Sequence, residues 1–436
     1  MRLQLGTFHV QDVAFSDETR LQDGVLYVNG EELQTYLSQD SLFDAIEVDI
    51  ARPGEETRIV HALDIVEPRV KVSGPGCVFP GVLGPPVTVG EGRTDRLAGL
   101  VVIGVAEPFV GETYWYGREA IIDMSGPGAE YSPFSRTVNL VLSFISNSQD
   151  RIEDGVSERT NYMVGSQTDE SAAKTNMTRL LCLKAAAYLA SVVKDKQPDS
   201  VETYELSKVQ PELPKIVYIH SNIAAGLYGS HDFSNSSAVL LHPNELMDGA
   251  LVNSFRWVDG ALRDATYFYQ SNSIVQELYA RHGKDINFLG VIMCNGYGES
   301  LDDKERESNS VAKIARMLGA QGAVLTPLRP GHSSVTHMMV CQKCEQAGIR
   351  TVIGEAQLNT SKGDPGFTYW VPEADAMVFP GDDETTVSLS PMKRVIGGSR
   401  ILNTDQDAMG AIEVDLRKLY GATNPLGPSK LSGRLY

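Results

Sequence analysis

The chain has 436 residues, 42% of them hydrophobic, which is enough to bury a core and is more than one ordinary domain requires. Its 56 acidic and 38 basic side chains give a formal net charge of -18, which would repel phosphate backbones and anionic lipid, so neither nucleic acids nor membranes are expected partners. No apolar run reaches the roughly 18 residues of a membrane span, and residues 1–10 lack the apolar segment of a secretory signal. We therefore expect cytoplasmic residence.

Residues 1–135 are predicted to form a β-rich N-terminal domain, a small barrel or sandwich. Gly, Pro, Val and Thr are frequent there, and strand-like runs at 24–28 and 100–103 lie between turn residues. The stretch 74–90, GPGCVFPGVLGPPVTVG, has too many Gly and Pro residues for a helix and predicts an ordered loop.

After residue 135 strand and helix patterns alternate, which predicts the α/β class. We divide this part into an α/β unit over 136–285 and a C-terminal Rossmann-like α/β unit over 286–436. The expected strands cover residues 138–145, 215–219, 238–241, 288–293, 323–326, 351–353 and 376–379. The expected helices cover residues 177–192, 310–318 and 335–347, with Gly348 as a C-cap.

Such alternation favours a parallel sheet that helices cover on both faces. Ligands bind such sheets outside the carboxyl ends of the strands. These ends are expected at residues 294–295, 326–327, 354–355 and 380–381.

A dense group of polar residues follows the strand-like run 238–241: His242, Asn244, Glu245 and Asp248. An imidazole, an amide and carboxylates at a strand end suit general acid/base or substrate-orienting work. The alternative, to which we give equal weight, is a capped turn in which Asn244 or Glu245 begins a helix.

Asn253-Ser254 is a candidate self-processing bond. A hydroxyl held against the preceding carbonyl can take over the acyl group, and elimination then leaves dehydroalanine, which hydrolyses to a pyruvoyl group that captures amines as a Schiff base. The dipeptide is common, so taken alone it favours an ordinary pair of residues.

The helix start near residues 331–334 could cradle a carboxylate or phosphate, since backbone N–H groups are free there; ordinary capping is the simpler alternative. His337, farther along that helix, is expected to be packed or solvated rather than a ligand, and we expect no metal site. Gly296-x-Gly298 lacks the third glycine of a dinucleotide fingerprint. Cys341-x-x-Cys344 lies in a helical pattern without a second ligand pair, which favours two thiols packed on one helical face.

Several longer motifs carry a family resemblance: LHPNE at 241–245 with DGA at 248–250, LYARHGKDINF at 278–288, DKER at 303–306, LGA at 318–320 and EQAGIRTV at 345–352. MRL at 1–3, DV at 12–13 and GVLYVN at 24–29 fit the same family's N-terminus. In these motifs the chain resembles the proprotein subunit of component B of glycine, sarcosine and betaine reductases, and more distantly the proprotein of D-proline reductase.

The resemblance implies a chain that is cleaved before an internal cysteine shortly after the Asp-Gly-Ala segment, leaving a pyruvoyl-type carbonyl that captures the substrate amine. This chain has no cysteine between Cys182 and Cys294. Ser254 is nearest in position, but serine is the weaker nucleophile for the acyl shift. We therefore expect an uncleaved relative whose substrate need not be glycine, with a serine-derived pyruvoyl group as the alternative.

The resemblance also implies a hetero-oligomeric reductase whose partner subunit carries a selenocysteine or cysteine and which cleaves a carbon–nitrogen or related bond in a small amine or amino-acid-like substrate. Glu245 and His242 would then orient or protonate the substrate, and Asn253-Ser254 would mark the former processing point. A non-catalytic scaffold or substrate-presenting subunit is the second hypothesis. The third is an independent thiol- or metal-dependent enzyme that uses Cys294, Cys341 or Cys344.

Overall fold

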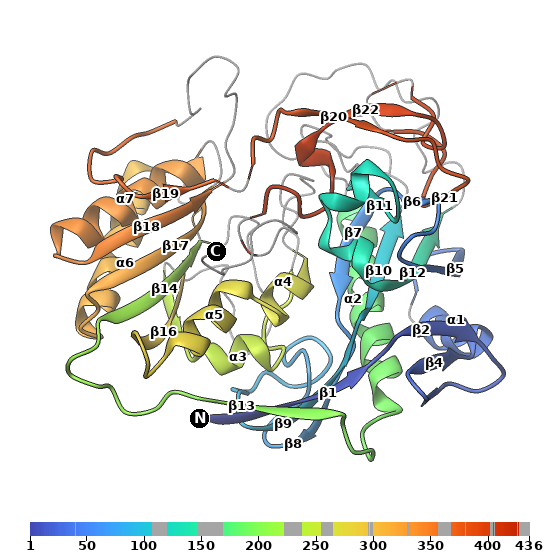
Figure 1. The fold of residues 1–436 in the computed structure, drawn as a ribbon, viewed down its shortest axis with the longest axis horizontal. Helices are drawn as coiled ribbons and strands as arrows, with labels where there is room; N and C mark the ends of the chain where they lie inside the picture. The colour runs from blue at the N-terminus through green and yellow to red at the C-terminus, as the bar shows by residue number, and fades with distance from the viewer. Residues whose placement is uncertain are drawn as a thin grey trace.

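The computed structural model describes residues 1–39, 41–106, 120–146, 169–221, 238–253, 265–294, 296, 300–328, 332–355, 368–379, 381–401, 404, 406–424 and 426. One sheet of the structure has six strands. In Figure 1 this sheet lies with helices α6 (Leu301–Met317) and α7 (His332–Gln346) on one side of the molecule, and the N-terminal sheets lie on the other. Between them lie three short helices, α3 (Pro243–Met247), α4 (Thr266–Gln270) and α5 (Ser273–Arg281). Within the described residues no helix has the length and apolarity of a membrane span.

Two four-stranded sheets dominate the N-terminal part, which confirms the β-rich prediction. In spatial order, the first contains β13 (Ser200–Glu205), β1 (Arg2–His9), β9 (Gly92–Ala98) and β8 (Arg69–Ser73). The second contains β5 (Ala45–Ala51), β12 (Val138–Ile145), β10 (Leu100–Ala106) and β7 (Ala62–Val66). Because β12 pairs in parallel with β10, the strand that follows residue 135 belongs to the N-terminal sheet.

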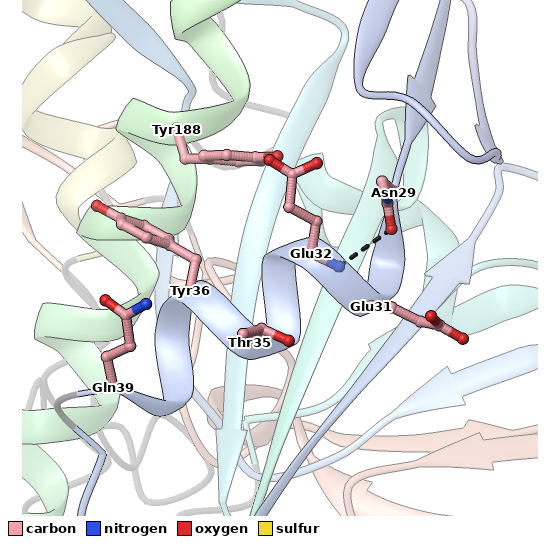
Figure 2. Close-up of a pocket in the computed structure, with 7 residues that line it drawn as sticks. All are labelled: Asn29, Glu31, Glu32, Thr35, Tyr36, Gln39 and Tyr188. Carbon is pink, nitrogen blue, oxygen red and sulfur yellow. Dashed lines mark hydrogen bonds between the residues drawn. The ribbon is translucent and has the colours of Figure 1, made fainter.

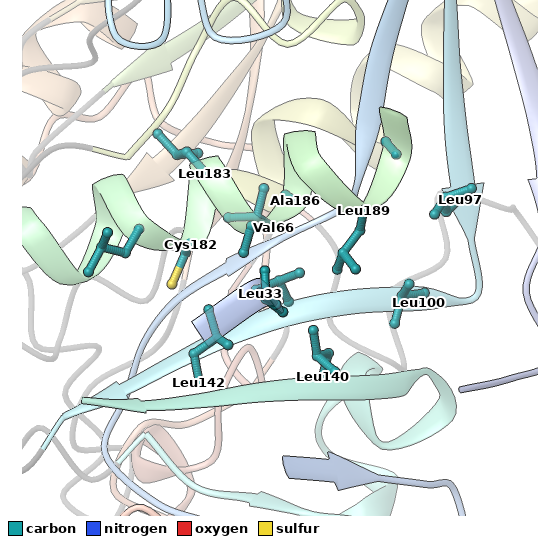
Figure 3. Packing of buried hydrophobic residues seen from close by; sticks show 14 of the residues in the cluster. Leu33, Val66, Leu97, Leu100, Leu140, Leu142, Cys182, Leu183, Ala186 and Leu189 are labelled. Carbon is teal, nitrogen blue, oxygen red and sulfur yellow. The ribbon is translucent and has the colours of Figure 1, made fainter. Parts of the chain in front are cut away.

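Two helices complete the core of this part. Helix α1 (Gly30–Ser38), absent from the sequence predictions, begins at Asn29, whose side chain accepts a hydrogen bond from the Glu32 N–H at 3.0 Å. Helix α2 (Asp169–Ser191) covers the second sheet, and its Cys182 and Leu189 point toward the β-strands in Figure 3. A Cβ on Gly104 of β10 would lie 2.3 Å from the Cys182 sulfur, so the close approach of α2 requires glycine there.

The six-stranded sheet confirms the α/β prediction. Its spatial order is β15 (Ala238–Leu241), β16 (Asn287–Cys294), β14 (Lys215–Ser221), β17 (Gly322–Leu328), β18 (Arg350–Glu355) and β19 (Met377–Val378). All neighbours except β15 pair in parallel, and numbered along the chain these five strands have the order 2-1-3-4-5. That is the doubly wound order of flavodoxin-like sheets, in which the connections change direction between the first and third strands. We call the place where the connections change direction the switch point, and here it lies between β14 and β17.

Two sequence predictions for this sheet need correction. The sequence predicts a buried strand at 238–241, but β15 is an antiparallel edge strand, and Leu240 is 44% exposed. An edge strand has a neighbour on one side only, so its apolar residues need not be buried. Helix α6 also begins at Leu301 rather than near Ser310. Ser300 caps it, and the acidic residues of its first turn suit the positive end of the helix dipole.

The remaining strands form three small sheets. These are β2 (Asp12–Phe15), β4 (Val25–Val28) and β3 (Arg20–Gln22); β11 (Ile122–Asp123), β6 (Thr57–Ile59) and β21 (Arg394–Ile396); and β20 (Thr386–Leu389) with β22 (Ile412–Asp415). Short 3₁₀ helices cover Pro127–Glu130, Pro133–Arg136 and Leu416–Lys418.

A fully buried arginine holds the C-terminal residues against the N-terminal part. The Nε of Arg58 donates to Asp123 at 2.6 Å, and its Nη atoms donate to the carbonyl oxygens of Ala408 at 2.7 Å and Ser390 at 2.8 Å. A buried guanidinium that loses its partners is strongly destabilising, so these bonds fix where Ser390 and Ala408 lie. The division into three domains at residues 135 and 285 stays a prediction.

Candidate functional site

Four charged side chains on β7, β8 and the turn between them hold the segments on either side of residues 254–264. We call Asp64, Glu67, Arg69 and Lys71 the charged clamp. Asp64 and Arg69 are fully buried, and the Glu67 and Lys71 side chains are nearly so. Charges this deep are stable only when they are paired and hydrogen-bonded, so their partners define the arrangement.

Arg69 links α3 to α4. Its guanidinium donates to the carbonyl oxygen of Met247 at the end of α3, and to the carbonyl oxygen of Gln270 at 2.9 Å at the end of α4. Glu67 balances the charge, with its carboxylate 2.6 Å from the Arg69 guanidinium. The Glu67 N–H also donates to the Gln270 side chain at 3.1 Å.

Asp64 holds the chain immediately around the predicted processing point. Its carboxylate accepts hydrogen bonds from the N–H and the hydroxyl of Thr266, each at 2.8 Å. The Thr266 hydroxyl in turn accepts from the N–H of Asn253 at 3.1 Å. Burial raises the pKa of Asp64, an effect that the Arg179 guanidinium opposes. Asn253 is thus connected through one hydroxyl to a buried carboxylate.

Lys71 binds Asp248, which together with Glu245 is one of the two carboxylates predicted as site residues. The Lys71 ammonium and the Thr94 hydroxyl both donate to Asp248, and the Gly90 N–H donates to it at 2.7 Å. Burial raises the pKa of Asp248, while these donors lower it. Asp248 is therefore held inside the protein, where it joins α3 to the Gly- and Pro-rich loop.

The clamp anchors residues 247–253 and 265–271 on the same pair of strands, so it sets the position of both flanks of residues 254–264. Ser254 itself lies outside the described residues. The clamp residues are absent from the sequence predictions. The signal for them is four charges, at 64, 67, 69 and 71, within the otherwise strand-like run 62–73, a pattern that indicates charges facing a core.

His242 and Glu245 form a capping box at the start of α3. The Asn244 N–H donates to the His242 Nδ1 at 3.2 Å, and the His242 N–H donates to the Glu245 Oε1 at 2.9 Å. A capped turn is therefore present, as in the alternative prediction, but the helix begins at Pro243 with His242 as its N-cap rather than at Asn244 or Glu245. A substrate-orienting role for the same side chains stays a prediction.

Asn244 joins three parts of the chain. Its Nδ2 donates to the carbonyl oxygens of Gly90 at 3.2 Å and Tyr204 at 3.1 Å, and its Oδ1 accepts from the Tyr279 hydroxyl. The predicted residues His242, Asn244, Glu245 and Asp248 therefore lie together, but the hydrogen bonds described here for them are internal to the protein.

The carboxyl ends of β14 and β17 carry a second polar group. The Tyr218 hydroxyl lies 2.6 Å from the Thr326 hydroxyl and 3.1 Å from the His220 Nδ1, all of them buried. The Asn272 side chain donates to Tyr218 at 3.4 Å, and the Tyr269 ring packs edge-on against His220 with centroids 5.6 Å apart. The prediction had named the Thr326 strand end but not that of β14.

The described residues offer no obvious redox or metal centre. No group of three or more His, Cys, Asp or Glu side chains among them could hold a metal ion. Cys341 and Cys344 are packed in the core on α7, as predicted, and burial raises their thiol pKa values to about 11 and about 12. Burial also raises the pKa of Cys294. These shifts oppose thiolate chemistry at all three cysteines.

A separate hollow of about 540 Å³ lies on the surface between α1 and α2 (Figure 2). Tyr36 and Tyr188 stack there with ring centroids 5.4 Å apart, beside Glu31 and Glu32. This hollow shares no residue with the clamp or with the polar group of Tyr218, His220 and Thr326 at the ends of β14 and β17.

The capping box predicts a specific pH dependence of stability. Burial and the nearby amino terminus lower the pKa of His242 from 6.5 to about 4. Because the folded chain binds this proton less readily than the unfolded chain, His242 contributes stability that is fully present above pH 6.5 and is lost as the pH falls toward 4. His242→Asn keeps an N-cap acceptor and removes the titration.

We expect urea unfolding at about pH 8 to give free energies of unfolding for the wild-type and His242→Asn chains that differ by no more than about 0.5 kcal/mol. At about pH 5 the variant should be the more stable. His9→Asn, at an exposed position, is the matched control. Parallel pH profiles for the wild-type and His242→Asn chains would contradict the assignment.

The family model and the similar proteins found by comparison all point to the same family. The family of glycine/sarcosine/betaine reductase component B subunits matches residues 1–434. The glycine reductase complex component B subunits alpha and beta of Peptoclostridium acidaminophilum are 36% identical over 459 residues, with both sequences fully covered.

From the same organism, the sarcosine reductase complex component B subunit alpha is 34% identical over 459 residues, again with full coverage of both. The betaine reductase complex component B subunit alpha is 32% identical over 424 residues, covering 93% of this chain and 90% of that protein. No solved structure gives a significant match. The chain therefore belongs to the glycine/sarcosine/betaine reductase component B family.

Proposed function

We propose that this chain is the substrate-binding subunit of a heteromeric reductase that cleaves a carbon–nitrogen or related carbon–heteroatom bond in a small amine or amino-acid-like substrate. The family supports a role in a reductase complex. The observation that carries the proposal is the charged clamp, which anchors the chain on both sides of residues 254–264. A substrate site requires supporting residues that hold its chain segments in fixed positions, and the clamp does this for both flanks of residues 254–264.

The electron-donating group would reside on a partner subunit that carries a selenocysteine or cysteine. In the chemistry that the family resemblance implies, a selenolate or thiolate is the attacking group, and only the ionised form of a thiol is the nucleophile. In this chain burial raises the pKa of every cysteine, including that of Cys77, the least buried of the five. The isolated chain should therefore show no turnover.

The Asn253-Ser254 bond remains intact in this proposal. The Asn253 N–H donates to the Thr266 hydroxyl, which supports a fixed position for Asn253 at the candidate processing point. Serine stands there in place of the thiol that the family resemblance implies. In the alternative, the Ser254 hydroxyl takes the Asn253 acyl group as an ester, elimination releases the Asn253 carboxylate, and hydrolysis of the resulting dehydroalanine releases ammonia and leaves a pyruvoyl group. The relatives' name "subunits alpha and beta" for one sequence favours that alternative.

The intact mass of the purified protein under denaturing conditions distinguishes an uncleaved chain from a chain that is cleaved at Asn253-Ser254. We expect one chain of 47.5 kDa that does not react with a carbonyl-directed hydrazide. Two fragments that meet at Asn253/Ser254, one of them reactive, would establish a serine-derived pyruvoyl group and refute the uncleaved state. Ser254→Ala is the control, because it removes the hydroxyl and should give a single unreactive chain in either case.

A non-catalytic scaffold or substrate-presenting subunit is the second candidate. It is favoured by the internal bonds of His242, Asn244, Glu245 and Asp248, which shape the fold without any substrate. Glu245→Gln distinguishes the two, since glutamine at the third helical position also completes a capping box and leaves α3 intact.

In the complex reconstituted with its partner subunits, a substrate-binding role predicts that Glu245→Gln lowers turnover by about 100-fold while assembly is unchanged. Assembly is measured by size-exclusion chromatography. Unchanged turnover would remove Glu245 from the chemistry, and lost assembly would support the scaffold. Glu413→Gln, on the exposed face of β22, is the matched control.

A further inference from the structure

The switch point of the six-stranded sheet contains buried polar groups that the reductase role has not used. β14 and β17 end side by side there with His220 and Thr326 in register. Helix α7 follows β17 along the chain and packs against β17 and β18 (Figure 1). Connections leave such a point in opposite directions, so side chains between them can meet a ligand.

His337 of α7 is 1% exposed, and neither of its ring nitrogens has a hydrogen-bond partner among the described residues. Its neighbour Thr336 is fully buried, and its hydroxyl likewise lacks a partner within the described part of the chain. The His220 imidazole lowers the pKa of His337, so the His337 ring lies within electrostatic reach of the β14 strand end.

Leaving buried polar atoms unpaired is costly, about 1–3 kcal/mol for each group. Replacing a buried, unpaired imidazole with an apolar side chain of similar size would remove that cost. Native structures seldom leave such groups unpaired, and a functional requirement is one of the recognised reasons. A ligand that accepts and donates hydrogen bonds would satisfy both residues.

We propose that the β14–β17 switch point binds a small carboxylate, with Thr336 and His337 as donors at the N-terminal part of α7. The helix has 15 residues, so its first turn carries the partial positive charge that favours an anion. The adjacent strand end shows the same recognition inside the chain: the Gly296 N–H, just beyond β16, donates to the Glu307 carboxylate at 2.6 Å.

The protonation state of His337 fits this ligand class. Burial first, and His220 second, lower its pKa to about 3, so near neutral pH the ring carries one N–H donor and one bare nitrogen acceptor. A neutral donor set at a helix N-terminus suits a singly charged carboxylate better than a phosphate, which is usually met by arginine or lysine. For an amino-acid-like ligand, the bare nitrogen could accept from the amine.

This site deepens the proposed function, because it rests on that function for the view that the carboxylate belongs to the substrate. The carboxylate site and the proposed function can each be refuted without the other. Binding of a simple carboxylate to the full-length isolated chain does not depend on turnover, and turnover by the complex does not depend on this location for the carboxylate.

Isothermal titration calorimetry of the full-length chain with acetate, glycine and methylammonium chloride tests the inference. We expect acetate and glycine to bind with dissociation constants of about 1 mM or below. Methylammonium, which lacks the carboxylate, should not bind. His337→Leu should weaken acetate binding roughly ten- to hundred-fold without lowering the melting temperature, because it removes an unpaired buried group.

Thr336→Val, close to isosteric, provides a second variant if His337→Leu does not fold, and it should also weaken acetate binding. Thr35→Val, on the exposed face of α1, is its matched control and should bind as the wild-type chain does. No binding of acetate or glycine, or equal acetate affinity in the wild-type chain and the folded variants, would overturn the site. If acetate binds as expected but Glu245→Gln leaves turnover unchanged, the carboxylate site stands and the proposed role of Glu245 fails.

Discussion

The buried charges of the clamp are the constraint on which the rest of the structure depends. Asp64, Arg69 and Lys71 lie on β7 and β8, and Glu67 lies in the turn between them. Each of these buried charges must find partners because a lone buried charge is costly. Several of their partners lie far along the chain, in residues 247–248 and 266–271. Strands β7 and β8 and helices α3 and α4 are thereby fixed to each other.

Helix α4 connects the clamp to the switch point. Thr266 and Gln270 face the clamp, while Tyr269 packs on the His220 ring at the end of β14. Asn272, just beyond α4, continues the contact by donating to Tyr218. Residues 266–272 therefore link the flank of Asn253 to the proposed carboxylate site. A substrate bound at the switch point and a reactive group near Ser254 would share one rigid support.

Much of the fold could be predicted from the sequence. The strands at 138–145, 215–219 and 288–293 and the Gly348 C-cap follow from local periodicity and turn chemistry, and the structure confirms them. The edge position of β15 and the sheet partner of β12 could not be predicted, because strand pairing depends on contacts distant in sequence. The family is recognisable from motifs such as LHPNE and LYARHGKDINF.

The candidate site could be predicted only in part. The polar group after residue 241 is real, but sequence spacing could not distinguish a capping box from an open catalytic group, since both need the same residues. The clamp and the His220–Thr326 group are formed by long-range contacts, of 202 residues for Asp64 with Thr266 and 106 for His220 with Thr326. Only the unusual charges within a strand-like run hint at the clamp.

We propose that the clamp holds Asn253, on one side of the candidate processing bond, in place for the work of the complex. Thr266→Val tests it most directly, because the valine removes the hydroxyl that links Asn253 to Asp64 at nearly constant side-chain volume. In the reconstituted complex we predict that turnover falls about ten-fold or more while assembly is retained, whereas Thr386→Val, at an exposed position of β20, changes neither. Full turnover by a correctly assembled Thr266→Val complex would contradict the account.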